Sequence, residues 1–133
     1  MNAQPIEIAE SCLRGAESNS MSFPEIVGKL MQAGFESYAI DFRRATATYY
    51  LTDGESVVFS THRLEAPIAP TLDTNIVRTA IREAQQSAPG YTYLGFCTKV
   101  MAGGCAGYVV SFSGRRAVYF GRTAETHVEP FPQ

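Results

Sequence analysis

The sequence of 133 residues has no tryptophan, no long apolar run and no marked excess of charge of either sign. Eleven basic and thirteen acidic residues give a net charge of -2, so the composition offers no reason to expect a nucleic-acid partner. No apolar stretch approaches the ~18 residues that span a bilayer. Residues 1–10 carry two glutamates in place of the apolar segment of a signal peptide. We therefore expect a cytoplasmic protein without a membrane partner.

Cysteine is also scarce, with three residues at positions 12, 97 and 105 and no CxxC pair. An odd count at these spacings argues against a secreted disulfide framework and against a zinc ribbon. Reduced thiols in a single domain are the simplest interpretation. Hydrophobic residues make up 45% of the chain, and a domain of this size buries enough surface to fold without a disulfide or a metal.

The chain contains an internal repeat. Residues 23–50 align without a gap on residues 93–120, at an offset of 70, and residues 8–16 align on 76–84 at an offset of 68. Pro89-Gly90 indicates a loop where the offset changes. The identical pairs of the longer block are Lys29/Lys99, Met31/Met101, Gly34/Gly104, Tyr38/Tyr108, Phe42/Phe112, Ala47/Ala117 and Tyr49/Tyr119. These matches predict two similar halves, at about 5–60 and 73–121.

Each half predicts two amphipathic helices followed by a β-hairpin. Ser22-Phe23-Pro24-Glu25 has the form of a capping box, and Gly34 is a helix stop. Asp53-Gly54 predicts a further turn and a third strand in the first half only. Residues 61–72 are expected to connect the halves, and residues 122–133 to form an extended tail. The fold class is therefore α+β, with an antiparallel sheet of about five strands and four helices on one face.

Two sets of side chains are candidates for chemistry at a site. An extended segment at 125–129 would place its acidic and histidine side chains on one face. With His62 these residues form a candidate metal site, comprising His62, His127, Glu125 and Glu129. The alternative is a solvated linker and tail. The second set could bind an anion at the turns, or could be solvated turn residues, and comprises Arg43, Arg44, Arg115, Arg116, Arg122, Tyr49 and Tyr119.

No catalytic constellation is recognisable, and no motif indicates a cofactor. Cys97 lies on the apolar stripe of its expected helix, which favours a buried structural thiol over a nucleophile. Gly103-Gly104 follows a helix and precedes a strand, the reverse of a phosphate-binding loop.

The segments MSFPEIVGKLMQAG (21–34), GFESYAIDFRRATATYYLTDG (34–54) and CAGYVVSFSGRRAVYFGRTAETHVEPFPQ (105–133) carry a family resemblance. The chain resembles the bacterial YbcV-like family, small proteins associated with prophage regions and often labelled "phage envelope protein". The resemblance covers essentially the whole chain. It implies no activity, cofactor or site residue, and nothing in the sequence supports the virion role in the label.

We favour a non-enzymatic module that binds a protein or a small ligand, with a homodimer as one form of that binding. Tyr49, Tyr50, Tyr119 and Phe120 cannot all point to one side of a sheet, so part of this aromatic set should lie on a second, exposed face. The alternatives are a metal-dependent enzyme that uses the histidines and an anion-binding protein that uses the turn arginines.

Overall fold

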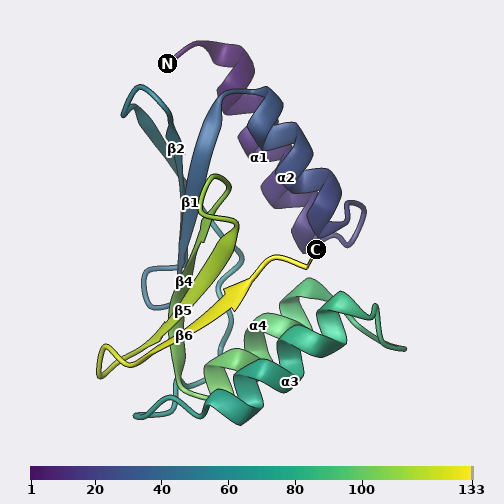
Figure 1. The fold of residues 1–133 in the computed structure, drawn as a ribbon, viewed down its shortest axis with the longest axis vertical. Coiled ribbons are helices and arrows are strands. Elements are labelled where there is room, and N and C mark those ends of the chain that lie inside the picture. The colour runs from purple at the N-terminus through teal and green to yellow at the C-terminus, as the bar shows by residue number, and fades with distance from the viewer. Residues whose placement is uncertain (133) are drawn as a thin grey trace.

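The computed structural model describes residues 1–132 and has the predicted α+β fold, with two helix pairs against one antiparallel sheet (Figure 1). Each half contributes two helices and three strands in the same order. The elements are α1 (Ala3–Glu17), α2 (Phe23–Gln32), β1 (Phe35–Asp41), β2 (Thr46–Leu51), β3 (Ser56–Ser60), α3 (Thr74–Gln85), α4 (Tyr93–Ala102), β4 (Cys105–Ser111), β5 (Arg116–Gly121) and β6 (Thr126–Pro130). No helix in residues 1–132 has the length and apolar character needed to cross a membrane.

Local sequence explains where the helices begin and end. The Ser22 side chain accepts a hydrogen bond from the backbone N–H of Glu25, and the Thr92 side chain accepts one from Gly95. Asp73 caps α3 in the same way. Gly34 and Gly104 follow α2 and α4 with φ of +98° and +90°, a left-handed conformation that glycine adopts without strain.

The sheet order is β3-β2-β1-β4-β5-β6, so the two halves meet at β1 and β4. In this antiparallel pair Ala39 lies opposite Val109, which is its own repeat equivalent at the offset of 70. The two halves are therefore related by an approximate two-fold axis through this point. The backbone repeats as well, since the left-handed residues Ala45 and Arg115 have φ of 54° and 53°. The predicted duplication thus appears in the geometry of the chain.

The sixth strand lies in the segment expected to be an extended tail. β6 pairs with β5 from Phe120–Thr126 to Arg116–Pro130, as β3 pairs with β2 in the first half. No turn signal is present in the sequence here because Ala124, with φ of 65°, occupies the position of Gly54 in the first half. Pro130 is accommodated because β6 is an edge strand.

The core lies between the helices and one face of the sheet (Figure 1). Tyr38 and Tyr108 are 7% and 5% exposed and occupy equivalent places in the two halves. Their rings form an edge-to-face pair with centroids 6.4 Å apart. Tyr49 and Tyr119 flank them, and Tyr50 and Phe120 lie on the opposite face, so the predicted division of this aromatic set is confirmed.

The connection at 61–72 breaks the symmetry of the halves. It crosses the end of α4, where Ala69 N–H donates to the Met101 carbonyl at 3.2 Å and Asp73 N–H donates to Gly103 at 2.7 Å. Met101 is consequently 3% exposed, whereas its equivalent Met31 is 54% exposed. The second half therefore has a covered surface that the first half lacks.

Candidate functional site

Three arginines surround a surface pocket of about 330 Å³ at the end of the sheet where β1 finishes. Arg43 comes from the β1–β2 turn, Arg63 from the connection and Arg122 from the β5–β6 turn. The remaining lining residues are apolar and come from the connection, α4 and the end of β1: Phe42, Leu64, Ala66, Ile68 and Met101. Cationic side chains and an apolar wall thus share one site, which we call the arginine pocket.

Local hydrogen bonds hold the arginines in place. The Asp41 carboxylate accepts the backbone N–H groups of Arg43 and Arg44 at 2.9 and 3.1 Å, which fixes the turn. Arg122 Nη1 donates to the Ile68 carbonyl at 3.2 Å, and this bond ties the β5–β6 turn to the connection. Arg63 Nη2 donates to the Arg44 carbonyl at 3.5 Å. The three arginines are therefore held by three separate segments of the chain.

The pocket has unbalanced positive charge. No carboxylate lines it among residues 1–132, although Asp41 and Glu65 adjoin lining residues in the chain. The ion pairs found within the described chain involve other residues, so none of the three guanidinium groups forms an ion pair with a carboxylate of residues 1–132. Arginine presents a planar fork of donors that matches carboxylate and phosphate oxygens. The arrangement suits an anion.

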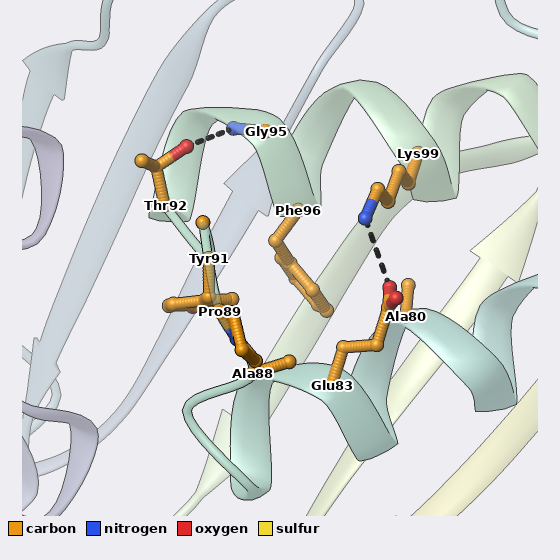
Figure 2. Close-up of a pocket in the computed structure, with 10 residues that line it drawn as sticks. Ala80, Glu83, Ala88, Pro89, Tyr91, Thr92, Gly95, Phe96 and Lys99 are labelled. Carbon is orange, nitrogen blue, oxygen red and sulfur yellow. Dashed lines mark hydrogen bonds and ion pairs between the residues drawn. The ribbon is translucent and has the colours of Figure 1, made fainter.

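A smaller pocket between α3 and α4 is not suited to a ligand (Figure 2). It has a volume of about 100 Å³, below the ~300 Å³ at which small-molecule sites begin. Its charged groups are already paired, since Lys99 Nζ lies 2.9 Å from Glu83 Oε1. Figure 2 marks this ion pair with a dashed line. The Thr92 hydroxyl on its rim serves as the cap of α4.

The buried tyrosines and cysteines form a protonated cluster beneath the helices. The hydroxyls of Tyr93 and Tyr108 lie 2.6 Å apart. Burial raises the pKa of Cys97 to about 12, and burial likewise raises the pKa of Cys105 to about 11. A thiol in this state is a poor nucleophile at neutral pH, so Cys97 is a structural residue, as the sequence favoured.

The candidate metal ligands are not brought together. His62 follows β3 and the other three belong to β6 and its turn, at the opposite edge of the sheet. His127 and Glu129 contact each other at 3.1 Å, but Glu125 accepts hydrogen bonds from Thr123 and from the Leu72 N–H. Within residues 1–132 there is no group of three or more side chains that could hold a metal ion.

The turn arginines separate into two groups. The β1–β2 and β4–β5 turns lie at opposite ends of the sheet because β1 and β4 are antiparallel, so Arg115 and Arg116 are remote from Arg43. Arg115 lies over the Phe131 ring at 5.9 Å. Tyr49 and Tyr119 are buried in the core at 3% and 7% exposure and contribute no surface to the arginine pocket.

Arg43 and Arg122 were among the predicted anion-binding residues, and Arg63 was not. Arg122 reaches the pocket because β5 ends where β1 ends, a fact of topology that requires the strand order. Arg63 lies in a segment with two prolines that carries no periodic pattern. Its neighbours Leu64, Ala66 and Ile68 alternate with polar or proline residues, and this alternation was the one available signal.

The fold and the pocket define a duplicated α+β domain with a cationic, partly apolar surface site. The sequence matches the family described as "Protein of unknown function (DUF1398)" over residues 13–129. The chain therefore belongs to the DUF1398 family. No curated protein matches it.

Proposed function

We propose that this protein is a non-catalytic binding module for a small anionic ligand with an apolar part, and that the ligand occupies the arginine pocket. The observation that carries the proposal is the convergence of Arg43, Arg63 and Arg122 on one pocket without a lining carboxylate. Three like charges held close together repel one another, so an anion that neutralises them is bound favourably. The oxygens of the ligand would meet the guanidinium groups.

The apolar lining supports a ligand that is more than a bare ion. Ile68 offers half-buried surface to a hydrocarbon or aromatic portion, and Phe42 offers a ring. An aromatic or branched-chain carboxylate has both parts. Inorganic phosphate satisfies only the arginines and should bind more weakly than such a carboxylate.

Thermal unfolding with added anions tests the proposal. Benzoate and phosphate serve as probes and chloride at equal ionic strength as the reference, since a ligand of the folded state at 100 times its Kd adds about 2.7 kcal/mol of stability. We expect benzoate to raise Tm by several degrees and the Arg43→Gln, Arg122→Gln double variant to lose the effect. Arg44→Gln, an exposed neighbour outside the pocket, is the matched control and should keep it.

Two results would overturn the proposal. One is a wild-type protein whose Tm is the same in benzoate, phosphate and chloride. The other is an equal loss of the benzoate effect in the Arg44→Gln control, which would show a general response to surface charge instead of a site.

The resemblance to YbcV-like proteins and the unpaired thiols support a proposal about the compartment in which the protein acts. We propose a bacterial, prophage-associated protein that acts in the cytoplasm, where cysteines stay reduced. Cys12, Cys97 and Cys105 are all unpaired and buried. A small binding protein in that compartment would meet carboxylate and phosphate metabolites.

A further inference from the structure

The face of the sheet away from the helices carries a row of six residues, five of them apolar. One residue from each strand contributes to it, and register places each beside the next. In sheet order the row is Val58, Thr48, Ala39, Val109, Val118 and Val128. Its outer valines, Val58 and Val128, are 56% and 45% exposed, and Val109 near the centre is 38% exposed. We call the surface centred on this row the open face.

The rows on either side add two aromatic residues, six serine and threonine residues and little charge. Tyr50 is 40% exposed, and Phe120 packs over Gly107, where a Cβ would meet its ring at 2.7 Å. Among the strand residues of these three rows, Asp41 and Arg116 alone carry side chains that are charged at neutral pH. Charged residues are scarce at the centres of protein interfaces. A face with exposed valines and two charged residues on six strands therefore indicates a surface that becomes covered.

The size of the open face fits an interface between two copies. Six strands about 4.8 Å apart and five residues at about 3.3 Å each give about 480 Å² on each copy. Two such faces in contact bury about 1,000 Å² in total, the lower limit for a specific interface. Paired sheets of this kind pack about 10 Å apart with their strands within about 30° of alignment.

The two charged residues are compatible with self-pairing. In a symmetric dimer the two-fold axis lies between the sheets, either across the strands or along them. With the axis across the strands, Arg116 faces Phe120 of the second copy and Asp41 faces Ser37. With the axis along the strands, Arg116 faces Tyr50 and Asp41 faces Gly107. Neither arrangement opposes like charges, and in both the guanidinium meets an aromatic ring.

We infer that the protein forms a symmetric homodimer in which the open faces of two copies pack against each other. The helices and the arginine pocket then lie on the outside of a four-layer assembly. The inference is independent of the proposed function, because the arginine pocket is not part of this face.

Sedimentation velocity over a range of concentrations tests the dimer, against a monomer mass of 14.5 kDa. We expect the wild type to reach twice that mass. Val109→Lys places an unpaired charge near the centre of the interface and should weaken the dimer by at least about tenfold in Kd. Met31→Lys is the matched control, since Met31 is an exposed apolar residue on α2 in the helical layer, and it should dimerise as the wild type does.

Circular dichroism checks that each variant is folded. If Val109→Lys does not fold, Val58→Lys takes its place, because the more exposed Val58 tolerates a charge with less effect on the monomer. A wild type that stays monomeric at every concentration overturns the inference. A dimer that persists unchanged in the folded lysine variant also overturns it and moves the contact to another surface, such as the edge of β3.

Discussion

Gly34 and Gly104 occupy the same position after α2 and α4 with nearly the same backbone angle, yet they have different surroundings. A Cβ on Gly34 would meet only the Leu51 side chain, at the ordinary contact distance of 3.7 Å. A Cβ on Gly104 would collide with the backbone of Thr71 in the connection. The two halves thus share the same backbone conformation after α2 and α4, but the connection packs closely against Gly104 and not against Gly34.

This difference predicts unequal effects of the same substitution. Gly34→Ala should lower the free energy of unfolding by about 1 kcal/mol, the cost of left-handed backbone at a residue with a Cβ. Gly104→Ala carries the same backbone cost and also displaces the connection, for a total of roughly 3 kcal/mol. Urea unfolding of both variants measures the difference. Equal losses would contradict the close contact between Gly104 and Thr71.

The hydrogen bond between Tyr93 and Tyr108 predicts a coupled pair of substitutions. Removing either hydroxyl, as Tyr93→Phe or Tyr108→Phe, should cost about 1 kcal/mol because the bond is lost and its partner is left in the core. The double variant should lose much less than the sum of the two single losses. The free energies of unfolding of the wild type, the two single variants and the double variant, measured by chemical unfolding, complete the double-mutant cycle. Additive losses would show that the two hydroxyls do not interact.

The buried thiols predict a loss of stability in alkaline solution. Burial raises the pKa of Cys97 to about 12 from the ordinary 9.0, so the unfolded chain releases this proton at a lower pH than the folded chain does. The contribution is fully present below about pH 9 and is lost as pH rises toward 12. Cys105 behaves in the same way, with a folded pKa of about 11.

Urea midpoints measured from neutral pH to about pH 10 follow this effect. Stability of the wild type should fall above pH 9, and Cys97→Ala should fall less steeply because one titrating group is gone. Alkylation at neutral pH provides a second measure, in which the folded protein reacts slowly and the unfolded protein rapidly. Rapid labelling of Cys97 in the folded state would contradict its burial.

The hydrogen bonds that Glu125 accepts predict a change in the pH dependence of stability in acidic solution. Hydrogen bonds from the Thr123 hydroxyl and from the Leu72 N–H lower the pKa of this carboxyl below its ordinary 4.5. A lowered folded pKa stabilises the protein above the unfolded value, and the contribution disappears as pH falls through the folded value. Glu125→Gln should therefore flatten the decline of Tm below pH 4.5. Glu65→Gln, in the connection outside the pocket lining, is the control and should decline as the wild type does.

Much of the fold was predictable because local signals and the repeat agreed. Ser22 and Thr92 mark helix starts and Gly34 and Gly104 mark helix ends, and each pair supports the other at an offset of 70. β6 was not predicted as a strand, because Ala124 replaced the glycine that identifies the same turn in the first half. A repeat carries structural information even where the local sequence has lost its signal.

The candidate site was less predictable, because it depends on which ends of the strands meet. Arg43 and Arg115 lie in the equivalent β1–β2 and β4–β5 turns, and on the sequence alone they were therefore grouped. The antiparallel contact between β1 and β4 sends them to opposite ends and brings Arg122 to Arg43 instead. Arg63 lines the pocket only because of the path that the connection takes. The connection has no equivalent in the repeat from which the position of Arg63 could be predicted.

The approximate two-fold axis between Ala39 and Val109 has an evolutionary consequence. An ancestor of half the length could have formed the same six-stranded sheet from two separate chains, with each supplying three strands and each first strand pairing with its twin. Fusion of two such genes would have required only the connecting segment. Once joined, the halves were free to diverge. The connection supplies Arg63 and much of the apolar wall of the arginine pocket, so a half-length ancestor without that segment would have had no such pocket.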